Sequence, residues 1–123
     1  MSTNEKDLRM YILVNQDLKI QKGKLAGQVG HAVSSYLYKI YKKGEEQDKL
    51  MIDEYMKSFQ KKVILRAPRI FLEMMERKGY VSVRDEGLTA LDPNTLTCVN
   101  LGIVDLHNIP EDIAFVKDMK LLN

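Results

Sequence analysis

The sequence predicts one α/β domain with a mixed four-stranded sheet and helices on both faces, in the order β-α-α-β-α-β-β-α. Short apolar runs rich in branched residues alternate with stretches whose apolar residues recur at helical spacing. The chain has 123 residues, 45% hydrophobic and 29% charged, which is enough apolar material for a single core. No linker, repeat or low-complexity tract divides it.

The first strand is expected over residues 10–15, a short run of branched and aromatic side chains. A polar loop follows, and the apolar period then changes, so we expect a helix over about residues 22–43. Gly44 comes directly after a basic segment, which suits a helix C-terminus. The expected inner stripe of this helix is Leu25, Val29, Ala32, Val33, Tyr36 and Ile40.

Two glycines fall in the middle of this helix, Gly27 and Gly30. Each is expected to cost about 0.5–1 kcal/mol relative to alanine. Such a cost suggests either another backbone packed close by or a tolerated substitution.

The middle of the chain predicts a helix, a strand and another helix. The helix is expected over about 46–59, the strand near 62–66, and the third helix from Pro68 to Gly79. The expected inner faces are Met51, Ile52, Tyr55, Met56 and Phe59 for the former helix, and Ile70, Phe71, Met74 and Met75 for the latter.

The last third predicts two strands and a final helix. The strands are expected at about 80–84 and 97–104, with a loop between them, and the helix from Pro110 to near Met119. The helical crossover between the first two strands favours parallel pairing. The last two strands either pair as a hairpin with a long loop or are not adjacent in the sheet. Strand order does not follow from the sequence.

Composition sets limits on the compartment and on the partners. Cys98 is the only cysteine, so no intrachain disulfide forms. The N-terminus lacks the apolar segment of a signal peptide, and no run approaches the ~20 apolar residues of a membrane span, so we expect a cytoplasmic protein. Residues 1–62 carry 12 Lys and Arg against 8 Asp and Glu, which makes this half the better candidate for contacting an anion.

Polar residues line one flank of the first helix. Lys24, Gln28, His31 and Ser35 recur at spacings of four, three and four. Lys24 lies in the first turn, where free backbone N–H groups already favour an anion, and Lys22, Gly23 and Lys19 are close by in the sequence. This flank is suited to hold a phosphate or a developing oxyanion. On pattern alone, a solvated rim is the more common structure.

A second polar cluster lies in the loop after the third strand. Asp85 and Thr89 belong to it, and Thr97 begins the next strand. These residues place a carboxylate and two hydroxyls at strand ends, although Asp-Glu-Gly alone is more often a simple turn. Two histidines and one cysteine give no metal-ligand spacing, and Cys98 is expected to be a buried small residue.

Both clusters resemble motifs of the type 2 peptidyl-tRNA hydrolase family. DLKIQKGKLAGQVGHAV is similar to the family's D-L-K and K-G-K-x-A-A-Q-x-x-H-A, and DEGLTALDPNTLTCVNLG is similar to its D-A-G-x-T-Q and the following threonine. KKVILRA and the tail PEDIAFVKDMKLLN resemble further family segments. The likeness covers residues 10–123 as a hydrolase-like domain, with residues 1–9 expected to be a flexible N-terminal segment.

The resemblance implies hydrolysis of the ester between peptide and tRNA in prematurely released peptidyl-tRNA, without metal or cofactor. It implies catalytic roles for Lys24, Asp85 and Thr97. The remaining implied residues contact the substrate: Lys19, Lys22, Gln28, His31 and Thr89. The sequence gives no oligomeric state, so a homodimer stays open.

The chain departs from the family pattern at several positions, most notably at Ala90, which stands where the motif has glutamine. Two alternatives follow. One is a non-catalytic relative that keeps the fold and binds tRNA, other RNA or phosphate. The other is a protein-interaction module whose basic helix flank binds an acidic partner.

Overall fold

The computed structural model describes residues 6–85 and 94–122, and within them four strands form one mixed sheet in the order β2-β1-β4-β3. β1 pairs in parallel with β2 and antiparallel with β4, and β3 pairs antiparallel with β4. The predicted parallel pair is confirmed, and the last two strands are neighbours. The strands are β1 (Leu8–Asn15), β2 (Lys61–Ala67), β3 (Val81–Arg84) and β4 (Leu96–Asp105).

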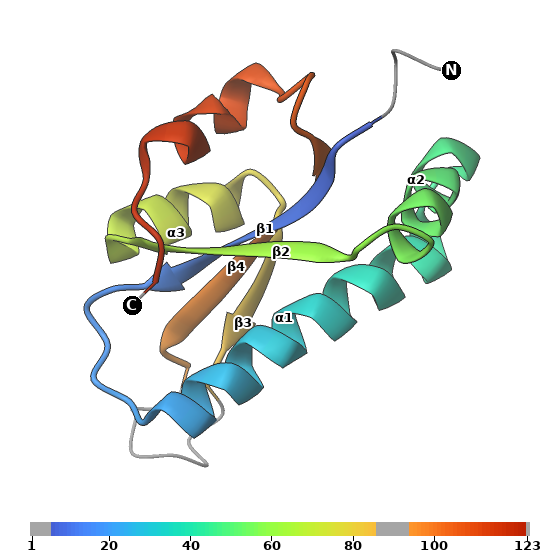
Figure 1. The fold of residues 1–123 in the computed structure, drawn as a ribbon. Coiled ribbons are helices and arrows are strands. Elements are labelled where there is room, and N and C mark those ends of the chain that lie inside the picture. Colours follow the sequence, from blue (N-terminus) through green and yellow to red (C-terminus); the bar gives the residue numbers. More distant parts are fainter. Residues whose placement is uncertain (1–5, 86–93, 123) are drawn as a thin grey trace.

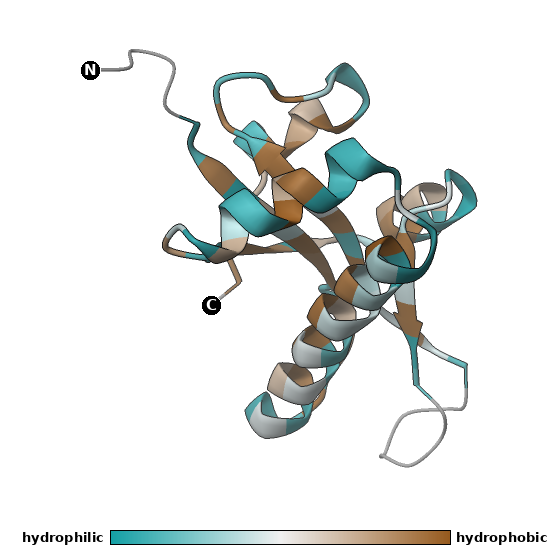
Figure 2. Ribbon diagram, turned by 90° about the vertical axis from the view of Figure 1, so that its right-hand side faces the viewer, coloured by the Kyte–Doolittle hydropathy of each residue, from teal (hydrophilic) through white to brown (hydrophobic). Residues whose placement is uncertain are grey.

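Helices cover both faces of this sheet, which confirms the predicted α/β class. The helical elements are α1 (Lys22–Lys43), α2 (Glu46–Met56), α3 (Arg69–Arg77) and the 3₁₀ segment η1 (Glu111–Asp118). Figure 1 shows α1 and α2 on one side of the strands, with α3 and the red-orange η1 on the other. In Figure 2 the brown, apolar parts of the helices face the brown strands between them.

The first helix begins and ends where the sequence predicts, at Lys22 and Lys43. Its last turn carries Lys42 and Lys43, and the Gly44 N–H donates to the Ile40 carbonyl at 2.8 Å. The bonded N–H satisfies a carbonyl group of the last turn, and the basic residues favour the negative end of the helix dipole. Of the predicted stripe, Ala32 is fully buried and Leu25, Val29, Val33 and Tyr36 pack beside it.

The second helix ends at Met56, three residues earlier than predicted. The Ser58 hydroxyl donates to the Tyr55 carbonyl at 2.6 Å, and Gln60 takes a positive φ of 52°. A serine that bonds a nearby carbonyl competes with helix propagation. Phe59 is therefore 89% exposed, so its predicted place on the inner face is wrong, as is that of Met56.

The third helix faces the core with Phe71 and Met75, as predicted, but not with Ile70 and Met74. Pro68 is its N-cap and not its first residue. Leu72 and Met75 are buried, whereas the predicted Ile70 is 68% exposed. Ile70 and Met74 lie four residues apart on a neighbouring stripe of the helix, so both turn outward together.

The last helical segment is a kinked 3₁₀ helix, where the sequence predicts an ordinary helix to near Met119. Ile113 departs from helical geometry with φ −121° and ψ 15°. Side chains three residues apart eclipse one another in a 3₁₀ helix. Ile113 and Val116 have this spacing, and both are buried against the sheet.

Two apolar clusters fill the space between the layers. The α3 and η1 side is formed by Tyr11, Leu13, Leu65, Ala67, Leu72, Met75, Leu96, Val99, Leu101, Val104, Ile113 and Val116. The α1 and α2 side is formed by Leu8, Met10, Ile12, Val14, Ala32, Tyr55, Val83 and Cys98. Among the described helices, none has the length and apolarity needed to cross a membrane.

Candidate active site

Buried polar side chains gather where three strands end and β4 begins. β1, β2 and β3 run in the same direction, so their carboxyl ends meet at the edge of the sheet from which β4 starts. The first turns of α1 lie at this same edge (Figure 1). Asn15, Asp85 and Thr97 are each buried here, at 2%, 3% and 0% exposure. The carboxyl edge of the parallel strands is where open α/β sheets usually bind ligands.

A β-bulge turns Thr97 toward α1. Val83 pairs with Cys98 and Arg84 pairs with Leu96, so Thr97 is the extra residue on β4. Simple alternation would place Thr97 and Cys98 on opposite faces, but a bulge re-aims one side chain. Cys98 packs in the cluster on the α1 side, and the Thr97 hydroxyl also reaches α1.

The Thr97 hydroxyl joins three elements. Its Oγ1 lies 3.0 Å from Gln28 Oε1 on α1 and 3.0 Å from the Val83 carbonyl oxygen on β3. A hydroxyl has one proton to donate and oxygen lone pairs to accept. Both contacts are satisfied together if the hydroxyl donates to the Val83 carbonyl and the Gln28 amide presents its NH₂ group. The amide orientation is set by this network.

Asp85 directly follows β3 and begins the connection to β4. Its backbone N–H donates to the Thr95 carbonyl at 2.8 Å, and its carbonyl accepts from the Asn94 N–H at 2.5 Å. These bonds fix the Asp85 backbone directly after the paired part of β3 and β4. Alternation from Val83, which packs toward α1, places the Asp85 side chain on the same face as the Thr97 hydroxyl.

No described residue accepts a hydrogen bond from the backbone N–H groups of the first three residues of α1. Gln21 is its N-cap without a side-chain bond, and the first turn contains no acidic residue. Lys24 is exposed and forms no hydrogen bond or ion pair with any residue that the structure describes. It lies four residues before Gln28, one turn along the same flank. The unbonded N–H groups and Lys24 together favour negative charge here.

The other predicted substrate contacts are distributed unevenly. Lys19, Lys22 and His31 are exposed, whereas Gln28 is half-buried against Thr97. The structure thus brings Gln28 and Thr97 into contact and places Lys24 one turn from Gln28. Thr89, together with the divergent Ala90, lies outside the described residues.

The two mid-helix glycines face open space. A Cβ added at Gly27 or at Gly30 would meet nothing within 4 Å. No neighbouring backbone in the described part of the chain requires a glycine at either position. Within residues 6–85 and 94–122, nothing therefore supports the packing explanation offered by the sequence.

Two asparagines were missed as structural supports of the site. The Asn15 Nδ2 donates to the Leu96 carbonyl at 3.0 Å, and its Oδ1 accepts from the Asp17 N–H at 3.0 Å. Asn100 Nδ2 donates to the Ala32 carbonyl on α1, also at 3.0 Å. An asparagine at the end of an apolar strand, as in MYILVN, is the available signal for such a turn.

Cys98 is fully buried, as predicted. Burial raises the pKa of its thiol to about 11. A thiol with this pKa stays protonated near neutral pH and is a poor nucleophile. Among residues 6–85 and 94–122, no three His, Cys, Asp or Glu side chains gather in a way that could hold a metal ion.

Residues 8–122 match the family model described as "Peptidyl-tRNA hydrolase PTH2". This chain belongs to that family. A protein of Staphylothermus marinus named peptidyl-tRNA hydrolase is 36% identical over 123 residues, covering 94% of this chain and 96% of its own. A protein of Methanopyrus kandleri with the same name is 38% identical over 101 residues, covering 76% of this chain and 83% of its own.

Membership of the peptidyl-tRNA hydrolase PTH2 family confirms the resemblance seen in the sequence. The matched residues contain the whole described sheet, α1 and the edge that carries Asp85 and Thr97. A relative from Thermoplasma volcanium with the same name is 32% identical over 102 residues, covering 77% of this chain and 84% of its own.

Proposed function

We propose that this chain hydrolyses the ester bond between peptide and tRNA in peptidyl-tRNA, and that Asp85, Thr97 and Lys24 carry the reaction. One observation in this member of the hydrolase family carries the assignment. The buried Thr97 hydroxyl contacts Gln28 on α1, at the edge of the sheet that also carries the buried Asp85, and Gln28 lies one helical turn from the exposed Lys24. A potential base, a hydroxyl and a cation thus lie at one edge of the sheet.

The proposed reaction is attack of a water molecule on the ester carbonyl carbon. Asp85 accepts the proton from this water, directly or through the Thr97 hydroxyl. The bond from the carbonyl carbon to the tRNA ribose oxygen then breaks, and that oxygen takes the proton from Asp85. The products are a peptide with a free carboxyl group and a tRNA with a free ribose hydroxyl.

Negative charge develops on the carbonyl oxygen during the attack. Lys24 and the free N–H groups at the start of α1 are proposed to stabilise it. Removing one such donor typically lowers kcat by about 10²–10³-fold. Gln28 holds the Thr97 hydroxyl in place, and Thr89 is proposed to help position the ester or the water.

Exposed lysines beside the site, together with His31, are proposed to contact the tRNA backbone. Lys19 and Lys22 lie just before and at the start of α1, and His31 lies farther along the same flank. Contacts to phosphates position the nucleic acid without reading its sequence. Binding should therefore weaken as salt rises and vary little between tRNAs. All of these residues come from one chain, so the proposal needs no homodimer. We also propose that the protein acts in the cytoplasm.

The test is hydrolysis of an N-acetylated aminoacyl-tRNA by the purified protein in the presence of a metal chelator. We expect turnover by the parent chain, and a loss of at least about 10²-fold in kcat for Asp85→Asn and for Lys24→Ala. Lys39→Ala is the matched control, because Lys39 is exposed on the same helix far from its N-terminus.

Two results would contradict the proposal. Absence of turnover by the parent, together with salt-sensitive tRNA binding, would make this chain a binding relative without catalysis. Turnover that Asp85→Asn and Lys24→Ala leave unchanged would keep the activity but move the chemistry to other residues.

A further inference from the structure

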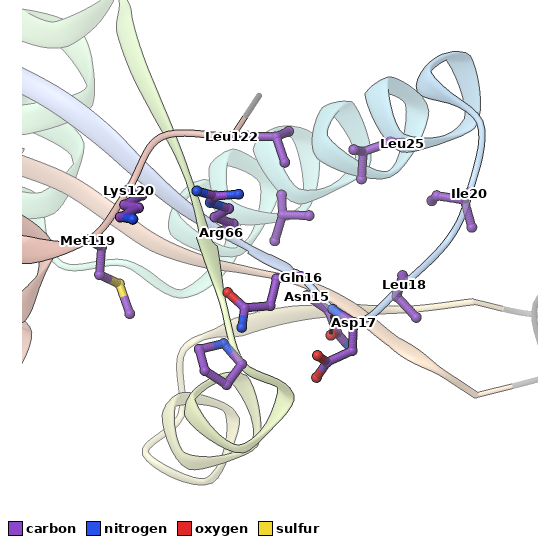
Figure 3. Close-up of a pocket in the computed structure, with 12 residues that line it drawn as sticks. Asn15, Gln16, Asp17, Leu18, Ile20, Leu25, Arg66, Met119, Lys120 and Leu122 are labelled. Carbon is purple, nitrogen blue, oxygen red and sulfur yellow. Dashed lines mark hydrogen bonds between the residues drawn. The ribbon is translucent and has the colours of Figure 1, made fainter.

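A pocket of about 660 Å³ opens beside the candidate active site. Its walls come from the loop after β1, the first turn of α1, the end of β2 and the segment after η1 (Figure 3). Leu18 and Ile20 of the loop and Leu25 of α1 form part of an apolar wall, and Leu122 completes it from the chain's last segment. The pocket therefore joins three parts of the chain that are distant in sequence, residues 14–25, 66–68 and 119–122.

Backbone pairing to β2 fixes the last segment beside the pocket. Leu65 and Leu121 form an isolated antiparallel bridge. The Arg66 N–H donates to the Lys120 carbonyl at 3.1 Å, and the Leu122 N–H donates to the Ile64 carbonyl at 2.9 Å. Arg66 and Lys120 are thereby held next to one another at the pocket.

These two cations have no counterion in the described part of the chain. Neither side chain forms a hydrogen bond or ion pair with a described residue. Asp17 is the one acidic residue among those lining the pocket, and its carboxylate accepts from the Arg69 N–H at the start of α3, at 3.4 Å. Two adjacent positive charges without a partner favour an anionic ligand, and a guanidinium suits the geometry of a phosphate.

The pocket borders the edge of the sheet that carries the site proposed for ester hydrolysis, although Lys24, Asp85 and Thr97 do not line it. Asn15 lines the pocket, and its side chain donates to the carbonyl of Leu96, the residue before Thr97. On the other side, Leu25 lines the pocket and directly follows Lys24. A ligand in the pocket would thus lie beside the groups that act on the ester.

We propose that this pocket binds a phosphate of the single-stranded 3′ end of tRNA through Arg66 and Lys120, with the apolar wall against the nucleotide. The inference rests on the proposed function, and it specifies where the 3′ end of the tRNA lies on the protein. A phosphate precedes the terminal nucleoside that carries the ester, so it lies close to the reacting bond. A peptide backbone is neutral and would leave both cations uncompensated.

The first test is binding of the trinucleotide CCA, which ends every tRNA, because it needs no catalysis. The parent is compared with the double variant Arg66→Gln/Lys120→Gln. We expect the variant to bind about tenfold more weakly, as for the loss of charge-assisted hydrogen bonds. We also expect its dependence of log K on log salt to fall by roughly 0.7 for each phosphate that the two cations no longer neutralise.

A matched control is Arg77→Gln/Lys117→Gln. Both residues are exposed, lie outside the pocket lining and give the same change in net charge. This variant should bind the trinucleotide like the parent. Equal weakening in both double variants would mean that net charge alone attracts the RNA, and it would overturn the proposed subsite.

A second test separates this inference from the proposed function. N-acetyl-aminoacyl esters of the CCA trinucleotide and of adenosine alone serve as substrates. The pocket variant should raise KM about tenfold for the trinucleotide ester and leave the adenosine ester, which has no phosphate, unchanged. Equal losses on both esters would indicate structural damage and contradict the inference.

The two proposals fail in different ways. An inactive parent chain that still binds CCA through Arg66 and Lys120 would refute ester hydrolysis and keep the phosphate subsite. An active parent chain whose pocket variant binds CCA normally would keep hydrolysis and refute the subsite. Loss of affinity for an N-acetylated peptide instead of CCA would assign the pocket to the peptide and overturn the inference.

Discussion

The two faces of the sheet are built from different kinds of side chain. The face under α3 and η1 is covered by an apolar cluster that includes Leu72 and Ile113. The face under α1 also has an apolar cluster, but Thr97 and Asn100 are buried beside it, and both bond to α1. The face under α3 and η1 therefore mainly stabilises the fold, whereas the face under α1 also positions polar groups.

Polar groups on the α1 face are fully bonded. Burying a polar group without a partner costs about 1–3 kcal/mol, so such groups persist when each has a partner. In the described residues, every buried side-chain nitrogen and oxygen atom has a hydrogen-bond partner. Substitutions should therefore act differently on the two faces, and the following changes test that difference.

The largest expected effect on stability comes from the apolar face. Leu72→Ala removes a fully buried side chain of α3 and should lower the free energy of unfolding by about 3 kcal/mol. Denaturant unfolding measures this loss. The folded fraction should keep its ester hydrolysis rate, because Leu72 lies on the face opposite α1. A fall in kcat equal to that of Asp85→Asn would remove the distinction between the faces.

A smaller loss is expected at Asn100. Its Nδ2 donates to the Ala32 carbonyl at 3.0 Å, and its Oδ1 accepts from the Gly102 N–H at 2.7 Å. Asn100→Ala leaves these backbone groups without that partner and should lower the free energy of unfolding by about 2 kcal/mol. Asn100→Leu restores the side-chain volume but not the two hydrogen bonds. If Asn100→Leu regains full stability, the role of the asparagine is packing alone.

A gain is expected on the exposed flank of α1. Gly27→Ala and Gly30→Ala each meet open space and should raise the free energy of unfolding by about 0.5–1 kcal/mol. Thermal unfolding of the single and double variants measures the gain. Unchanged or lower stability would show that these positions have contacts beyond the described residues.

The smallest effect is expected at Asp7, outside both clusters. Hydrogen bonds from Arg9 and then Lys61 lower the pKa of Asp7 from 3.8 to about 2. A carboxyl whose pKa is lower in the folded state contributes stability above its unfolded pKa. This contribution is lost as pH falls from about 4 toward 2.

The comparison for Asp7 is between the parent and Asp7→Asn. The parent should unfold at a higher denaturant concentration at pH 6, and the difference should shrink as pH falls from about 4 to 2 and below, because Asp7 becomes protonated. The gain is modest because the carboxylate is partly exposed. A difference that grows as the solution is acidified would have the wrong sign.

Much of the fold follows from local pattern. The bounds of α1 follow from its apolar period and from Gly44, and the parallel β1–β2 pair follows from the helical crossover. Local pattern fails where a short helix has two apolar stripes. Ile70 and Met74 then look as suitable for burial as Leu72 and Met75, and the way α3 packs on the sheet decides between them.

The candidate site residues follow from residue type and spacing, but their geometry does not. Thr97 faces α1 because of a bulge, and strict alternation along β4 would turn it away from Cys98. Arg66 and Lys120 meet only because Leu121 bridges to Leu65, a pairing between segments far apart in sequence. Such long-range pairings leave no periodic signal in the chain.

The most direct measurement compares single-turnover hydrolysis of N-acetyl-aminoacyl-tRNA by Thr97→Val and Thr97→Ser. Valine keeps the shape and removes the hydroxyl, whereas serine keeps the hydroxyl that contacts Gln28 and Val83. We expect a rate about 10²-fold below the parent for valine and within a few-fold of the parent for serine. Equal rates for the two variants would contradict a catalytic role for the polar groups on the α1 face.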